Sequence, residues 1–171
     1  MTRPQLSDRY LAAHRRRRLL EGAAEAVAVL GSDKVKVAEL VTFSHCARNT
    51  FYEMFGSRDD CLRQLLETAA SELFYAAVDG GIAGALDYLR ENANMARVLI
   101  VEGWAIDAGI VDEYTMRFAE LLHSPAGPRE ELLIAGAAEM LRAGLRVDGV
   151  DTLPTVTDVG HFLGAFALVP A

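Results

Sequence analysis

The sequence has few cysteines, the residues typical of redox and metal chemistry, and no long apolar run. It has two cysteines among 171 residues. Cys46 and Cys61 show no metal-ligand spacing, so we interpret both as packing residues. No run approaches the ~20 apolar residues that would span a bilayer. The arginines at 15–18 precede a helix interrupted by Glu, unlike the apolar core of a signal peptide. We therefore expect a cytoplasmic protein without a membrane partner.

The sequence also lacks a Gly-rich phosphate loop, a nucleophile elbow and a Cys/His dyad. Two spacings are compatible with a di-metal helical bundle: Glu120-x-x-His123 and Asp158-x-x-His161, with Glu102 or Glu139 as a further carboxylate. His123 directly precedes Ser-Pro at a helix end, where His commonly complements the helix dipole. The second pair has Asp in place of Glu. We predict no enzyme, metal or cofactor, and keep a di-metal carboxylate enzyme as an alternative from another class.

The net charge of −7 conceals a strong asymmetry along the chain. Residues 1–63 contain 11 Lys and Arg against 8 Asp and Glu, whereas the remaining residues contain 6 against 16. The basic N-terminal region suits binding to nucleic-acid phosphates, whereas the acidic remainder would be repelled by them. The 51% apolar content is ample for a buried core.

Residues 37–55, VAELVTFSHCARNTFYEMF, predict a helix-turn-helix. We expect helices over about 35–43 and 47–55, with a tight break at Ser44-His45-Cys46. At 100° per residue, Ala47, Phe51, Met54 and Phe55 share one arc, while Arg48, Asn49, Tyr52 and Glu53 lie opposite with Thr50 at the flank. Arg and Asn can bond guanine and adenine bidentately, and Thr and Tyr hydroxyls suit phosphates. From residue types alone, an ordinary helical corner with a solvated polar face is an equal alternative.

Residues 50–62, TFYEMFGSRDDCL, resemble the recognition helix and the start of the fourth helix of the TetR family of transcriptional regulators. Residues 18–25, closed by Gly31, are similar to that family's first helix. The match covers roughly residues 15 to 65. It implies an all-α fold, with an arm and helix-turn-helix head over residues 1–56 and a helical ligand-binding and dimerisation domain over 57–171.

The resemblance also implies a function: a DNA-binding repressor released from a palindromic operator by a small-molecule effector. A DNA-binding protein that needs no effector is the alternative. Base readout and close backbone contact are expected from Arg48, Asn49 and Tyr52. Phosphate contact is expected from Lys36, Thr50 and Arg58, with His45 in the turn beside them.

The chain departs from the family pattern in its turn and its helix caps. His45 stands where Gly is usual, and His adopts a left-handed conformation less readily. Ala47 and Lys36 replace the usual capping Ser and Thr, each at a cost of ~1 kcal/mol. Glu53 is repulsive near phosphates unless it accepts from a cytosine amine. Operator sequence and affinity therefore need not follow the family.

The remaining chain predicts helices separated by Gly, Pro and polar breaks. We expect residues 1–14 to form a flexible arm and Ser57 to form a capping box with Asp60. The expected helices span about 15–30, 58–79 (ended by Gly80-Gly81), 82–92, 93–108, 110–123, 129–146 and 155–168, with loops at 124–128 and 148–154.

The middle helices carry many aromatic and Met residues, which at helical spacing are more often core than pocket. The resemblance nevertheless implies a cavity among them for an apolar or cationic ligand. The candidate ligand-binding residues are Tyr88, Met95, Leu99, Glu102, Trp104 and Met116.

The last two expected helices present broad apolar stripes with small residues in the middle. A two-fold partner would cover them, and two heads would read both halves of a palindrome. The alternative is that these helices close the core of a single chain. The candidate dimer-interface residues are Leu133, Gly136, Ala137, Met140, Phe162 and Phe166.

Overall fold

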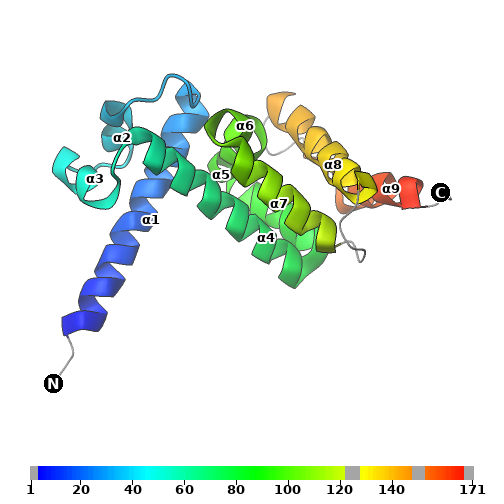
Figure 1. The fold of residues 1–171 in the computed structure, drawn as a ribbon, viewed down its shortest axis with the longest axis horizontal. Coiled ribbons are helices and arrows are strands. Elements are labelled where there is room, and N and C mark those ends of the chain that lie inside the picture. Colours follow the sequence, from blue (N-terminus) through cyan, green and yellow to red (C-terminus); the bar gives the residue numbers. More distant parts are fainter. Residues whose placement is uncertain (1–3, 122–127, 148–152, 168–171) are drawn as a thin grey trace. The chain divides into compact units, whose positions relative to one another are not determined.

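The computed structural model describes residues 4–121, 128–147 and 153–167. Over these ranges the chain forms helices and no strands, so the predicted all-α class is confirmed (Figure 1). It divides into two compact units, Met1–Leu65 and Leu66–Ala171. We predicted the boundary at residues 56/57, at the start of a helix. The first unit extends further because it includes the opening turns of that helix, where Cys61, Leu62 and Leu65 are buried.

The first unit contains α1 (Pro4–Leu30), α2 (Val37–Phe43), α3 (Arg48–Met54) and the beginning of α4 (Arg58–Glu91). The prediction of a flexible arm over residues 1–14 is wrong from Pro4 onward, where the chain is helical. Proline is favoured at a first helical position because its fixed φ suits the helix and its missing N–H is not needed there. The core consists mainly of Leu19, Leu20, Ala23, Val27, Leu40, Phe51 and Phe55.

α4 consists of two helical segments that meet at Gly81, where φ is 60° and ψ is −149°. A Cβ on Gly84 would lie 2.4 Å from the carbonyl oxygen of Ala76. The Tyr88 hydroxyl donates to Glu72 Oε2 at 3.0 Å. These two contacts pair positions that mirror each other about residue 80, so the segments form an antiparallel helical hairpin. The predicted break at Gly80-Gly81 is confirmed.

The predicted single helix over 93–108 contains a π-helical turn. α5 (Ala93–Arg97) continues into η1 (Val98–Glu102) and then α6 (Gly103–Ile106). Asp107 is extended, with φ −160°, and ends this run. Its carboxylate accepts from the backbone N–H groups of Gly109 and Ile110 at 2.9 and 3.3 Å. It thereby caps α7 (Ala108–Leu121), which begins two residues earlier than predicted.

The two last helices are α8 (Pro128–Val147) and α9 (Val156–Ala167). The predicted loops at 124–128 and 148–154 fall largely outside the described residues. Thr155 N–H and Oγ donate to Asp158 Oδ2 at 2.8 and 2.7 Å, which caps α9. The second unit's core joins both segments of α4 to η1, α8 and α9 through Leu73, Leu86, Leu89, Ala96, Ile100, Leu145, Leu153 and Val159.

Several residues predicted at a dimer interface have contacts inside the chain. A Cβ on Gly136 would lie 2.4 Å from Cζ of Phe162, so the α9 ring packs directly on the α8 backbone. Leu133, Ala137 and Met140 are half-buried, and the side chain of Phe166 lies outside the described residues. Among the α8 side chains that the structure describes, the exposed ones are Leu132, Ala135, Glu139 and Ala143. These four, which share one side of the helix, are called the outer face of α8 below.

Candidate functional site

The turn between α2 and α3 is held against α1 by two contacts. Gly22 of α1 lies against it so closely that a Cβ there would be 2.4 Å from Ser44 Cα. The buried Ser44 hydroxyl donates to the Leu19 carbonyl at 3.0 Å. His45 adopts φ 49°, in the left-handed region that residues other than glycine seldom enter. The turn is therefore held in one conformation relative to α1.

α3 has one buried face and one open face. Phe51 and Phe55 are essentially inaccessible, and Met54 is half-buried. Ala47, expected on the core side, is exposed as the N-cap residue and gives no side-chain cap bond, because an alanine has no acceptor. Arg48, Asn49, Tyr52 and Glu53 are exposed, with Thr50 half-buried beside them. The four exposed residues are called the open face of α3 below.

Within the open face, the Arg48 guanidinium lies 5.9 Å from the centroid of the Tyr52 ring. This contact between neighbouring turns orients a long side chain that would otherwise be mobile. Tyr52 keeps 48% of its surface exposed. An exposed, partly oriented Arg beside Asn and Tyr is suited to contact base edges and backbone in a DNA groove.

Two further cations of the first unit stabilise the head. Arg58 Nε donates to the Val35 carbonyl at 2.7 Å, and its guanidinium also bonds the Ser32 carbonyl and Asp59. Arg16 bonds Gln64 and lies 5.3 Å from the centroid of the Phe55 ring. Sequence reasoning assigned Arg58 to phosphate, which stays a prediction, but the structure gives this side chain a structural role.

The cations that remain open to solvent include Arg15, Arg18 and Lys36. The Lys36 backbone N–H donates to Glu39 Oε2 at 3.0 Å, which caps α2 although lysine offers no acceptor of its own. The Lys36 ammonium is thus free to point outward at a helix start, where phosphates also bind backbone N–H groups. At the start of α4, Asp60 N–H donates to Ser57 Oγ at 3.1 Å, while Asp60 Oδ2 accepts from Gly56 rather than from Ser57.

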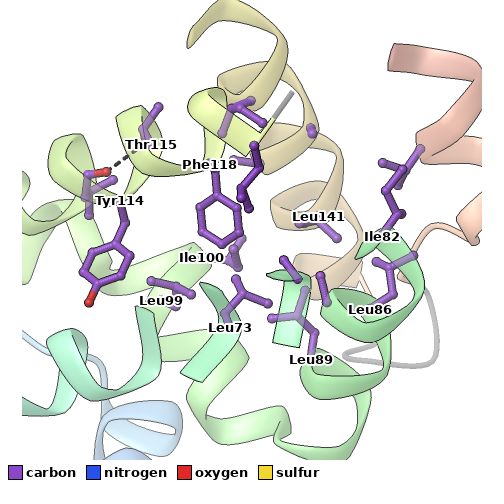
Figure 2. Close-up of a pocket in the computed structure, with 18 of the residues that line it drawn as sticks. Leu73, Ile82, Leu86, Leu89, Leu99, Ile100, Tyr114, Thr115, Phe118 and Leu141 are labelled. Carbon is purple, nitrogen blue, oxygen red and sulfur yellow. Dashed lines mark hydrogen bonds between the residues drawn. The ribbon is translucent and has the colours of Figure 1, made fainter. Parts of the chain in front are cut away.

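The second unit contains a cavity of about 500 Å³. Figure 2 shows its walls, where Leu73 and Leu86 of α4, Ile100 of η1, Phe118 of α7 and Leu141 of α8 surround one space. Most of the lining is aliphatic or aromatic. The remaining described lining residues are Ala77, Val78, Gly81, Ile82, Ala85, Leu89, Leu99, Trp104, Val111, Tyr114, Thr115, Leu121, Ile134, Ala137, Ala138, Arg142 and Val159.

Two of the six predicted ligand-binding residues, Leu99 and Trp104, line this cavity. The other four lie outside the described lining. Met95 is buried and Met116 is 50% exposed, whereas Glu102 is half-buried. Tyr88 bonds Glu72, and burial together with that carboxylate raises the pKa of its hydroxyl. Ala137, predicted at the dimer interface, is a lining residue. Sequence reasoning missed the aliphatic walls, for which leucine periodicity was the available signal.

The polar groups near the cavity are mostly engaged. The Thr115 hydroxyl donates to the Val111 carbonyl at 2.8 Å. Arg142 Nε donates to the Ile100 carbonyl at 3.0 Å, and its Nη1 lies 3.4 Å from Glu139. The guanidinium of Arg117 lies 4.4 Å from the Phe74 ring centroid and 4.7 Å from that of Tyr114. These aromatic faces therefore already hold a cation.

The residues nominated for a di-metal site have other contacts or cannot be placed. His123 lies outside the described residues. Asp158 caps α9, and the bonds from Thr155 lower the pKa of its carboxyl. Glu139 pairs with Arg142. In the described ranges, no three His, Cys, Asp or Glu side chains gather as metal ligands.

Both cysteines have the properties of packing residues. Cys61 is fully buried and Cys46 is half-buried. Burial raises the pKa of the Cys46 thiol, and raises that of Cys61 to about 12. Both thiols are therefore protonated at neutral pH, which disfavours nucleophilic chemistry.

Comparison with known proteins gives structural matches only. No family model and no curated protein sequence matches the chain. A TetR-family transcriptional regulator from Streptomyces coelicolor matches with a TM-score of 0.53 and 19% identity, over 90% of this chain and 97% of that one. A protein assigned to the same family from Mesorhizobium loti MAFF303099 matches with a TM-score of 0.54 and 13% identity, over 91% and 94%. Within the part of the chain that is described, no helix is long and apolar enough to cross a membrane. The chain has the fold of the TetR-family transcriptional regulators.

Proposed function

We propose that this protein is a DNA-binding transcriptional regulator of the TetR type that inserts α3 into the major groove. The open face of α3 carries the proposal, because it presents Arg48, Asn49 and Tyr52 on a helix whose opposite side packs into the core through Phe51. Exposed cations on α1 and at Lys36 supply phosphate contacts around it. Arg48 and Asn49 read bases, while Thr50 and His45 lie where the helix enters the groove.

The cavity in the second unit supports regulation by a small molecule. Its volume lies within the range of ligand pockets, and its lining is predominantly apolar. An effector that binds one arrangement of α4 better than another would shift the balance between operator-bound and free protein. We propose that the protein acts as a repressor that the effector releases from a palindromic operator.

The reading role of Arg48 is testable once bound DNA has been selected in vitro. Arg48→Ala should cost ~1–3 kcal/mol on the selected site and relax the preference at one base pair, because a bidentate base contact is lost. Lys36→Ala is the matched control. It should weaken selected and unrelated sequences alike and reduce the salt slope by about 1. Both effects are measured by binding titrations across salt concentrations.

An Arg48→Ala protein with unchanged selectivity would remove Arg48 from the set of base-reading residues. The alternative function, DNA binding without an effector, is supported if a broad ligand screen finds no compound that raises the melting temperature.

A further inference from the structure

The charge at the cavity wall is of one sign. Among the described lining residues, Arg142 alone carries a charge, and no carboxylate faces the space. The other polar lining groups belong to Trp104, Tyr114 and Thr115, and Thr115 already donates to a backbone carbonyl. A ligand charge placed in such a wall needs an opposite charge beside it, since burying an unpaired ion in apolar surroundings is costly.

The guanidinium of Arg142 is positioned by the protein and only loosely paired. Its Nε is bound to the Ile100 carbonyl in η1, which fixes the side chain against the wall of the cavity. Its Nη1 lies 3.4 Å from Oε2 of Glu139 on the same helix. The Glu139 side chain is 62% exposed. Because Glu139 is solvated, the pair contributes little, so exchanging this carboxylate for that of a ligand costs little free energy.

A cationic ligand is disfavoured by the same lining. It would face Arg142 without an opposing carboxylate. Of the described aromatic lining residues, Tyr114 is already covered by Arg117 at 4.7 Å. Of the apolar and cationic ligands expected from the sequence, the lining therefore disfavours the cationic ones.

We propose that the cavity binds a lipophilic anion, of the acyl-chain carboxylate class. The carboxylate pairs with Arg142, and the hydrocarbon chain lies along Leu73, Leu86 and Phe118. Only the identification of this anion as the effector rests on the proposed function; its binding in the cavity does not. Trp104 lines the cavity with 51% of its surface exposed and is the single tryptophan of the chain, so its fluorescence reports ligand entry directly.

The test compares three probes of equal chain length on the unaltered full-length protein: dodecanoate and dodecyltrimethylammonium below their critical micelle concentrations, and dodecanol below its solubility limit. Trp104 fluorescence and thermal shift give the dissociation constants. Dodecanoate should bind about tenfold or more tightly than dodecanol, and the ammonium most weakly, because only the carboxylate gains a charge-assisted bond. Equal affinity for alcohol and carboxylate, preferred binding of the ammonium, or no binding of any probe overturns the proposal.

Variants locate the anion contact. Arg142→Gln should reduce dodecanoate affinity about tenfold and leave dodecanol unchanged, whereas Arg142→Lys should keep part of the preference. Arg63→Gln, which removes an exposed arginine of the first unit, should change neither. An Arg142→Gln protein that still prefers dodecanoate overturns the assignment. Operator binding is measured separately: dodecanoate that binds without affecting the operator refutes effector release while leaving this assignment intact.

Discussion

At the scale of single residues, Gly22 controls how closely α1 approaches the helix-turn-helix. Gly22→Ala would place a Cβ 2.4 Å from Ser44 Cα, a backbone atom that cannot swing aside. We expect a loss of ~1–3 kcal/mol in the local stability of α2 and α3 through overpacking. Hydrogen exchange of the amides in these two helices measures it.

Gly56→Ala is the control for this change, because the nearest atom to its added Cβ is Asp60 Oδ2 at 3.8 Å. It should leave the local stability of α2 and α3, measured by the same exchange, within about 0.5 kcal/mol of that in the unaltered protein. Equal amide protection in both variants would show that the close approach of Gly22 to Ser44 does not determine the stability of α2 and α3.

Residue positions were predictable where a helix has two clearly different faces. Helical periodicity at 100° per residue placed Phe51 on the buried face and Arg48 and Tyr52 on the opposite one, as observed. The positive φ of His45 was indicated by the glycine that is usual at this position. Ala47 was misplaced because a small apolar residue at a helix start need not face the core. The carbonyl partners of Arg58 come from a segment more than 20 residues away, which helical periodicity does not describe.

At the scale of elements, Gly81 makes the hairpin of α4 possible. Its φ of 60° and ψ of −149° lie in a region that is essentially restricted to glycine. Gly81→Ala should therefore destabilise the second unit by ~1–3 kcal/mol, although the added Cβ meets no atom within 4 Å. The urea midpoint monitored by circular dichroism would fall accordingly.

Gly80→Ala provides a direct comparison, since its Cβ is equally unobstructed and its φ is not positive. Alanine at that position should be neutral or slightly stabilising, because it restricts the unfolded chain. If both substitutions lower the midpoint equally, backbone strain at Gly81 is not the feature that shapes the hairpin.

Most helix boundaries could be predicted from glycine, proline and capping residues. The π-helical turn of η1 could not, because its residues, VLIVE, have no pattern that distinguishes it from an ordinary helical turn. The turn forms part of the cavity wall, where the Ile100 carbonyl accepts a hydrogen bond from Arg142 Nε. The cavity itself requires the three-dimensional approach of α4, η1, α7 and α8, so only Leu99 and Trp104 of the six nominated residues line it, and their ligand-binding role stays a prediction.

At the scale of the whole molecule, the contact of Gly136 with Phe162 bears on how chains associate. Because these residues pack within one chain, replacing them would disturb the second unit itself rather than an interface alone. The outer face of α8 is better suited to a partner. It carries Leu132, 67% exposed, with the small Ala135 and Ala143 along the same side, where a second helix can approach closely.

We therefore predict a homodimer in which the outer face of α8 contacts its two-fold copy, so that two heads read both halves of an operator. The double variant Leu132→Glu, Ala135→Glu should sediment as a monomer with unchanged helix content and lose operator binding, because like charges would meet across the two-fold axis. Met116→Glu, at another exposed apolar position on α7, should remain dimeric. Unaltered protein that sediments as a monomer at micromolar concentration contradicts the dimer. A monomeric Met116→Glu variant instead moves the interface to α7, since a single glutamate dissociates a dimer only where it is buried against the partner.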